Sequence, residues 1–168
     1  KSTLISRISN ARPKIAGYPF TTLVPNLGIV KLEEGESFVA ADIPGLIEGA
    51  NEGKGLGHQF LRHIERTRLL LHLIDFSDVE PESILDRYYK LQVELKAFNE
   101  DLFWKPQIIV ATKLDDLHSV RNLEKIRSKM SKLNPLLFEI SSVTGEGIEN
   151  LLWKIKECLA LEKSKDLE

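Results

Sequence analysis

The first two residues of the chain, Lys1 and Ser2, are of the types that bind nucleotide phosphates. A phosphate-binding loop ends in Gly-Lys-Ser/Thr and continues into a helix, where the lysine neutralises the β- and γ-phosphates and the hydroxyl binds Mg²⁺. Lys-Ser pairs are common in proteins, so this pair alone does not indicate a site. The Lys1-Ser2 pair indicates a phosphate-binding site only if other nucleotide-binding motifs occur elsewhere in the sequence.

A carboxylate follows the apolar residues 38–41, because Asp42 ends this segment and Gly45 lies three residues further on. A carboxylate at a strand end can hold a water bound to Mg²⁺, and a glycine lets a bare backbone N–H approach a γ-phosphate. The alternative is an ordinary strand-to-turn transition, since Asp and Pro-Gly are typical turn residues. On its own the segment leaves both interpretations open.

The segment Thr112-Lys113-Leu114-Asp115 follows the apolar residues 108–111 and has the residue types that recognise guanine. A carboxylate accepts hydrogen bonds from the N1–H and N2–H₂ groups of guanine, a donor pair that adenine lacks. The lysine stem can lie along the plane of the base. The alternative is a solvated loop that opens a helix, with Asp115 or Asp116 as its N-terminal cap.

A fourth loop, residues 140–147, also follows an apolar segment and contains Ser141, Ser142 and Val143. Its backbone amides could contact the carbonyl oxygen of guanine. The alternative is a plain turn that puts Thr144 or Glu146 at the start of the last helix.

These loops need strands and helices that bring them to one edge of a sheet. Apolar runs typical of strands alternate with segments whose apolar residues recur every three or four positions, as in amphipathic helices. This alternation predicts an α/β fold whose mostly parallel sheet is covered by helices on both faces, with one antiparallel edge hairpin. Ligands of such folds bind beyond the carboxyl ends of the strands. The expected strands are residues 27–32, 37–41, 69–75, 107–111 and 136–140, and the expected helices are residues 56–67, 84–98, 120–133 and 148–159.

Composition limits the class of protein. The 168 residues suffice for one domain, and their 42% hydrophobic and 29% charged content is typical of a soluble globular protein. A net charge of -2 argues against a surface devoted wholly to nucleic acid or to a membrane. The single cysteine, Cys158, excludes an internal disulfide framework and suits a reducing cytoplasm. Because the apolar runs are too short to span a bilayer, we expect a cytoplasmic protein with no membrane partner.

The order of the four loops, with Thr21-Thr22 between the first two, is that of a Ras-like GTPase. Residues 17–28, 42–50 and 53–67 in particular resemble the GTPase domain of the Obg family. The resemblance implies a Ras-like P-loop NTPase fold, a three-layer sandwich, over residues 1–160, lacking the first strand and most of the phosphate loop. Residues 161–168 are expected to form a charged tail that frays.

The resemblance also implies a role for each matching residue. Lys1 would bind the β- and γ-phosphates, Ser2 and Thr22 would bind Mg²⁺ directly, and Asp42 would bind it through water. The residues expected to contact phosphate, metal or the switch region are Lys1, Ser2, Phe20, Thr21, Thr22, Leu23, Val24, Asp42, Ile43, Pro44 and Gly45, and those expected to bind guanine are Thr112, Lys113, Leu114, Asp115, Ser141, Ser142 and Val143.

The sequence departs from the family pattern at three positions. Thr112 stands where the family has Asn, but Asp115 carries the discrimination against adenine, so guanine specificity should survive. Ser142 stands where Ala is usual, in a contact made by the backbone. Leu46 stands where Ras-type proteins have the Gln that orients the attacking water. Because Leu cannot polarise water, we expect slow intrinsic hydrolysis and assign no catalytic side chain. Relatives without this Gln use K⁺, which makes K⁺ a candidate cofactor beside Mg²⁺.

The resemblance thus implies a monomeric, Mg²⁺-dependent GTP-binding and GTP-hydrolysing switch that acts in large ribosomal subunit assembly and in growth or stress control. The alternative is a nucleotide-state-dependent module that docks to the ribosome with negligible hydrolysis, which Leu46 keeps open. An ATPase or nucleotide kinase is a third interpretation, which the guanine-recognition residues disfavour. A basic cluster would contact ribosomal RNA or form an ordinary solvated face; its members are Lys54, Arg62, Arg66 and Arg68.

Several other residues have an ordinary structural interpretation. His58 and His63 are five positions apart, so they do not share a helix face as metal ligands would. Asp75 ends an apolar segment and could resemble the strand-end carboxylate of an ATPase. No glycine follows it to meet a γ-phosphate, so we expect Asp75 to be a turn residue. Trp104 and Trp153 are expected to serve packing and not binding.

Overall fold

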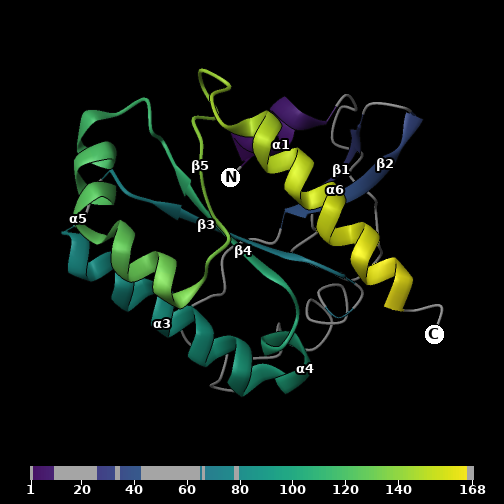
Figure 1. Ribbon diagram of the computed structural model, residues 1–168, viewed down its shortest axis with the longest axis horizontal. Coiled ribbons are helices and arrows are strands. Elements are labelled where there is room, and N and C mark those ends of the chain that lie inside the picture. Colours follow the sequence, from purple (N-terminus) through teal and green to yellow (C-terminus); the bar gives the residue numbers. More distant parts are fainter. Residues whose placement is uncertain are drawn as a thin grey trace. The chain divides into compact units, whose positions relative to one another are not determined.

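The computed structural model describes residues 2–9, 26–32, 35–42, 65, 67–77 and 80–165 (Figure 1). They belong to two compact units, Lys1–Arg66 and Thr67–Glu168. The helix expected at residues 56–67 falls almost entirely outside the described residues.

The first unit contains a short helix and a hairpin. The helix is α1 (Ser2–Ile8), and the hairpin pairs β1 (Asn26–Lys31) with β2 (Ser37–Asp42) in antiparallel register. The hairpin expected from the sequence is therefore confirmed, and it leaves Asp42 as the last residue of β2.

The end of α1 packs closely on β1. Ser9 forms an isolated antiparallel bridge with Val30, and both Val30 and Leu4 are buried. A Cβ atom added to Gly28 would lie 2.9 Å from the Cβ of Ser9, nearer than two such atoms approach. Glycine at this position is what lets the chain after α1 meet the strand.

The second unit contains a three-stranded parallel sheet. Its strands are β3 (Leu70–Asp75), β4 (Gln107–Thr112) and β5 (Leu137–Glu139), in the order β3-β4-β5. The register pairs Asp75 with Thr112, so β3 and β4 end together. The parallel sheet confirms the expected arrangement, while β1 and β2 form a separate two-stranded sheet among the described residues.

Helices cover both faces of this sheet. Figure 1 shows α3 (Pro81–Phe98) and α5 (Leu117–Leu133) on one side of the strands and α6 (Ile148–Lys165) on the other. A single turn, α4 (Glu100–Phe103), follows α3 and was not expected from the sequence. The periodic apolar residues of the long helices face the sheet, as the amphipathic pattern predicts.

The main core lies between the sheet and the pair α3 and α5. On β4 the alternate residues Ile108 and Val110 point to the opposite face and are also fully buried, as expected for a parallel sheet covered on both sides. The buried residues of the main core are Ile74, Phe76, Ile84, Tyr88, Ile109, Ala111, Leu123, Ile126 and Met130.

Two sequence expectations are corrected. Trp104 and Trp153 were expected to serve packing, but their exposed fractions are 73% and 69%, so most of each ring faces solvent. The Trp104 ring makes an edge-on contact with the Phe103 ring, at 5.0 Å between ring centroids. The segment expected to fray after residue 160 continues α6 as far as Lys165.

Candidate functional site

The loops that follow β4 and β5 meet at the carboxyl edge of the sheet. The Ser141 hydroxyl donates a 2.6 Å hydrogen bond to Oδ1 of Asp115, and the Leu114 amide donates to the carbonyl of Ile140 at 3.2 Å. Ser141 is fully buried, whereas Asp115 is exposed. The structure therefore brings together the third and fourth loops singled out in the sequence.

Ser141 also organises the loop to which it belongs. Its Oγ accepts hydrogen bonds from the amides of Val143 at 3.2 Å and Thr144 at 3.0 Å, and its carbonyl accepts from the Gly145 amide at 2.9 Å. The Val143 amide, expected to face a base, thus already has a partner within the loop. It would have to exchange this bond in order to contact a carbonyl oxygen of guanine.

The loop after β5 depends on a glycine at its end. Gly147 has a φ of +73°, and a Cβ atom there would lie 2.0 Å from the carbonyl oxygen of Glu139. Only glycine fits this combination of left-handed backbone and close approach. The loop therefore returns tightly to the last residue of β5 before α6 begins.

The two adjacent aspartates of the loop after β4 have different tasks. Asp116 is the N-cap of α5: its Oδ2 accepts from the Ser119 amide at 2.9 Å. Asp115 caps nothing, and its Oδ2 has no hydrogen-bond partner among the described residues. Asp116 is therefore the helix cap that the alternative interpretation expected at Asp115 or Asp116, and this cap does not use the Asp115 carboxylate.

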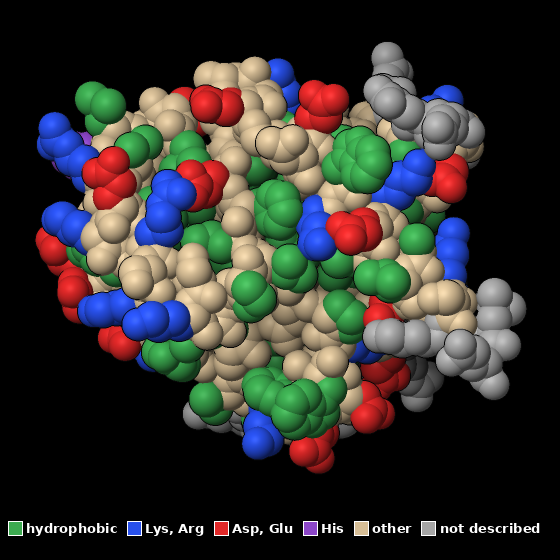
Figure 2. All heavy atoms as spheres, in the orientation of Figure 1, with side chains coloured by type: hydrophobic (Ala, Val, Ile, Leu, Met, Phe, Trp, Pro, Cys, Tyr) green, Lys and Arg blue, Asp and Glu red, His purple; other side chains and the backbone are tan. Residues whose placement is uncertain are grey.

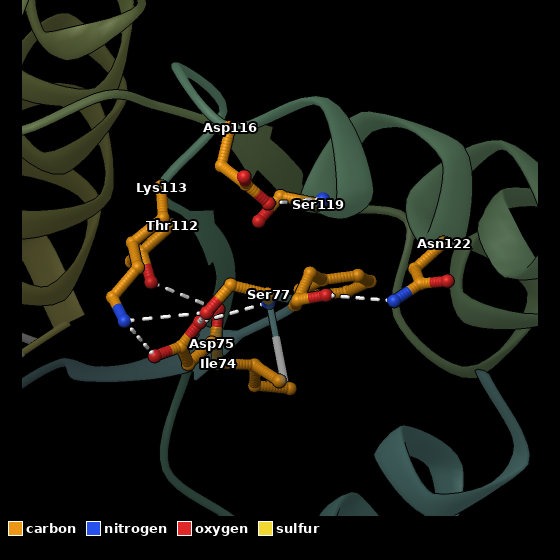
Figure 3. A network of polar contacts seen from close by, with 9 residues as sticks. Ile74, Asp75, Ser77, Thr112, Lys113, Asp116, Ser119 and Asn122 are labelled. Atoms are coloured by element: carbon orange, nitrogen blue, oxygen red, sulfur yellow. Dashed lines mark hydrogen bonds and ion pairs between the residues drawn. The ribbon is translucent and has the colours of Figure 1, made fainter. Parts of the chain in front are cut away.

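Lys113 is held by two residues at the end of β3 (Figure 3). Its Nζ lies 2.6 Å from Oδ2 of Asp75 and 3.2 Å from Oγ of Ser77. The Ser77 amide and hydroxyl both donate to Oδ1 of Asp75, at 2.9 and 2.7 Å. Lys113 also has a φ of 63°, the only positive φ of a non-glycine residue in the described part of the chain.

Two further hydrogen bonds tie the end of β3 to its neighbours. The Thr112 hydroxyl donates to the carbonyl of Ile74 at 3.0 Å, and the Asn122 side chain of α5 donates to the carbonyl of Phe76 at 2.8 Å (Figure 3). Thr112, which replaces the Asn of the family pattern, therefore bridges two strand ends.

The charges of this cluster favour the ion pair. Burial raises the pKa of the Asp75 carboxyl group, but hydrogen bonds from Lys113 and Ser77, together with the charge of Lys113, outweigh it and hold the pKa below its ordinary value. The carboxylate is therefore ionised at neutral pH.

The phosphate- and metal-binding residues expected in the first unit lie mostly outside the described part. Ser2 is the first residue of α1 and Asp42 is the last residue of β2. The structure describes the backbone of these two residues but not their side chains. The other expected residues lie outside the described part altogether: Lys1, Phe20, Thr21, Thr22, Leu23, Val24, Ile43, Pro44 and Gly45. His58 and His63 also fall outside it.

Sequence reasoning missed the part that Asp75 and Ser77 play. The expected turn role of Asp75 is confirmed, since its side chain accepts from the Ser77 amide two residues on. Its pairing with Lys113 was not foreseen. The available signal was that two apolar segments of a parallel sheet both end in a charged residue of opposite sign, at the same edge.

No helix in the described part of the chain is long and apolar enough to cross a membrane.

Comparisons with known proteins agree on one family. A family model described as 50S ribosome-binding GTPase matches residues 1–113. The chain is 52% identical over 159 residues to GTPase Obg of Halalkalibacterium halodurans and 53% identical over 159 residues to GTPase Obg of Geobacillus thermodenitrificans. These matches cover 95% of this chain but only 37% and 36% of the two relatives, so the chain spans little more than a third of their length.

Solved structures support the fold. A variant of Aquifex aeolicus Era bound to GDP and AlF4⁻ matches with a TM-score of 0.64 at 22% identity, covering 92% of this chain and 51% of that one. The G domain of the T. maritima FeoB iron transporter matches with a TM-score of 0.63 at 22% identity, covering 95% of this chain and 91% of that one. At this identity the likeness concerns the fold alone, and it confirms the expected Ras-like α/β architecture.

Proposed function

Because the chain belongs to the 50S ribosome-binding GTPase family, as the GTPase domain of an Obg-family protein, we propose that it binds GTP and GDP and hydrolyses GTP as a molecular switch. The observation that carries this proposal is the state of Asp115. One of its oxygens is held by Ser141, the other has no partner among the described residues, and Asp116 performs the capping.

The held carboxylate suits guanine. The bond from Ser141 fixes its orientation, so the remaining lone pairs can accept from the N1–H and N2–H₂ groups of the base. Each such bond to a charged acceptor contributes about 1.5–3 kcal/mol. Adenine offers no such pair of donors, so Asp115 would favour guanine nucleotides over adenine nucleotides.

Mg²⁺ is the metal that the expected donors fit. Ser2, Thr22 and Asp42 offer two hydroxyls and a carboxylate, the hard oxygen ligands that Mg²⁺ prefers. Bound there, Mg²⁺ would neutralise charge on the β- and γ-phosphates. The first two residues of α1 would then supply its positive N-terminal end to the same phosphates.

Hydrolysis is expected to be slow without help. Leu46 stands where a water-orienting Gln is found in Ras-type proteins, and Leu has no group that can orient water. K⁺ or the ribosome would supply the missing activation. The alternative function, a nucleotide-state-dependent module that docks to the ribosome with negligible hydrolysis, would need no activation.

The large ribosomal subunit is the proposed partner, and a basic face of α5 supports contact with its RNA. Positions three or four apart share one helix face, and the exposed basic residues there are His118, Arg121, Lys125, Lys129 and Lys132. The four Lys and Arg side chains have no ion-pair partner among the described residues. Figure 2 shows Lys and Arg side chains on the left, where Figure 1 places α5, with a few acidic ones among them.

The base preference can be tested by competition. A fluorescent guanine nucleotide bound to the full-length protein would be displaced with GDP, ADP and XDP. We expect displacement by GDP at concentrations at least about 100-fold below those needed for ADP. Equal displacement by ADP would contradict guanine recognition, and with it the proposed GTPase function.

The switch and docking interpretations differ in single-turnover hydrolysis. We expect GTP cleavage to accelerate when K⁺ replaces Na⁺ or when large subunits are added. If neither K⁺ nor large subunits accelerate GTP cleavage, the docking module is favoured.

The basic face can be tested by removing two of its charges. The K125Q/K129Q variant should bind large subunits several-fold more weakly, and its binding should depend less steeply on salt, because fewer phosphates are neutralised. A matched control, R87Q/K90Q, removes two exposed charges from α3 and should bind as the wild type does. Equal behaviour of the two variants would contradict this choice of surface.

A further inference from the structure

A closed polar triangle joins the end of β3 to the loop that follows β4. Asp75, Ser77 and Lys113 each contact the other two: carboxylate to ammonium, hydroxyl to carboxylate and ammonium to hydroxyl (Figure 3). Lys113 and Asp75 have side chains that are 53% and 39% exposed, so the triangle faces solvent at the edge of the sheet. Neither Asp75 nor Ser77 is among the residues to which the proposed function assigns a role.

We propose that Asp75, together with Ser77, is a positioning residue that fixes the Lys113 side chain in the conformation that receives the guanine base. This inference rests on the proposed guanine recognition and adds two residues of β3 and its following turn to that site.

The triangle holds the Lys113 ammonium and leaves its aliphatic stem for contact with a base. The ammonium is occupied by Asp75 and Ser77, whereas the aliphatic stem is what lies along a base. A lysine side chain has four rotatable bonds and much rotamer entropy to lose when a ligand orders it. Anchoring the ammonium before the base arrives reduces that loss, so Asp75 should raise affinity without touching the nucleotide.

Other contacts hold the strand ends without the Asp75 carboxylate. β3 and β4 are joined by backbone pairing, the Thr112 hydroxyl donates to Ile74, and Asn122 donates to Phe76. Asn at position 75 would keep an oxygen for the Ser77 amide, but it would replace the charged Oδ2 that accepts from Lys113 by an NH₂ group, which only donates. The Asp75→Asn variant should therefore fold normally, and a change in binding would report on the ion pair.

A double-mutant cycle tests the proposal. GDP and guanosine dissociation constants would be measured for the full-length wild type, Asp75→Asn, Lys113→Met and the double variant. We expect Asp75→Asn to weaken binding by roughly three- to five-fold, near the upper end for an exposed ion pair. The same factor should apply to guanosine, because Asp75 acts on the base through the stem. In the Lys113→Met background, Asp75→Asn should change binding by less than about two-fold.

A control and a second variant keep the result interpretable. Asp86→Asn, at an exposed carboxylate of α3, should leave both constants unchanged. Ser77→Ala removes the hydroxyl and leaves both charges, so it should weaken binding by roughly two-fold, and only when Lys113 is present. This variant tests the triangle even if Asp75→Asn proves unstable.

The outcomes separate this inference from the proposed function. Unchanged or tighter binding in Asp75→Asn, or an equal loss in the Lys113→Met background, would overturn the positioning role. If GDP and ADP compete equally in the wild type, the proposed guanine recognition fails first. If GDP is preferred and the cycle shows no coupling, only the positioning role fails.

Discussion

The carboxyl edge of the β3-β4-β5 sheet and the apolar core behind it are held together by different forces. The edge depends on single hydrogen bonds and ion pairs in which at least one side chain is exposed, such as Ser141 to Asp115 and Lys113 to Asp75. The core depends on fully buried side chains such as Leu123 and Met130. Replacing one edge residue should therefore change binding more than stability, and replacing one core residue should do the reverse.

The largest stability effect is expected in the core. Leu123→Ala removes a side chain of α5 that is 1% exposed and packed in the main cluster. It should lower the free energy of unfolding by roughly 2–5 kcal/mol, measured by denaturant titration, because it opens a cavity. The ratio of GDP to ADP affinity should stay unchanged in the folded protein. A changed ratio would show that core and edge are not separable.

His72 makes the stability of the core depend on pH. It is 6% exposed, its Nδ1 has no partner within the described part, and burial lowers its pKa from 6.5 to about 4. Between these values the unfolded chain binds a proton that the native state does not, so stability falls as the pH falls from 6.5 towards 4. The contribution of this group is present in full above pH 6.5.

The His72→Leu variant isolates this effect from that of the carboxyl groups. Over the same interval the wild type should lose about 3 kcal/mol more than the variant, as measured by denaturant titration at several pH values. Parallel stability curves for the two proteins would contradict the neutral, desolvated state of His72.

Much of the fold could be predicted from the sequence, because its signals are local. Continuous apolar residues predict β3 and β4, and the three-and-four spacing predicts α3 and α5. The single turn of α4 is too short to show a periodic apolar pattern. The segment after position 160 is charged, but it also contains good helix formers, and these continue α6. The two exposed tryptophans show that a large apolar residue need not be buried.

The site was predictable only where one loop carries its own signal. Asp115 and Lys113 lie in one short segment, but the sequence could not decide whether Asp115 or Asp116 caps α5. Asp75 and Lys113 are far apart in the chain and meet because β3 and β4 end in the same register. Such a contact follows from tertiary structure, which no local pattern contains.

A smaller effect on both properties is expected at the junction of the two loops. Ser141→Ala removes the donor to Asp115 and the acceptor of the Val143 and Thr144 amides. GDP binding should weaken by roughly ten-fold, and the free energy of unfolding should fall by about 1–2 kcal/mol. A control at an exposed serine of α5, Ser128→Ala, should change neither. Equal effects of the two variants would show that the hydroxyl of Ser141 has no special part.

The smallest effect is expected at the helix cap. Asp116→Ala removes the acceptor for the Ser119 amide and should cost about 1 kcal/mol of stability, detectable as a lower thermal midpoint. Its preference for GDP over ADP should equal that of the wild type. A lost preference would mean that Asp116, and not Asp115, contacts the base.

The most direct measurement compares Asp115→Asn with Asp116→Asn for their affinities towards GDP and XDP in the full-length protein. Asn also caps helices, so Asp116→Asn is a matched control that keeps the structure of the loop. Asp115→Asn should bind GDP about 100-fold more weakly and prefer XDP, because its amide can donate to the carbonyl that replaces the 2-amino group. The control should still prefer GDP. An unchanged preference in Asp115→Asn, or a reversal in Asp116→Asn instead, would contradict the assignment of guanine recognition to Asp115.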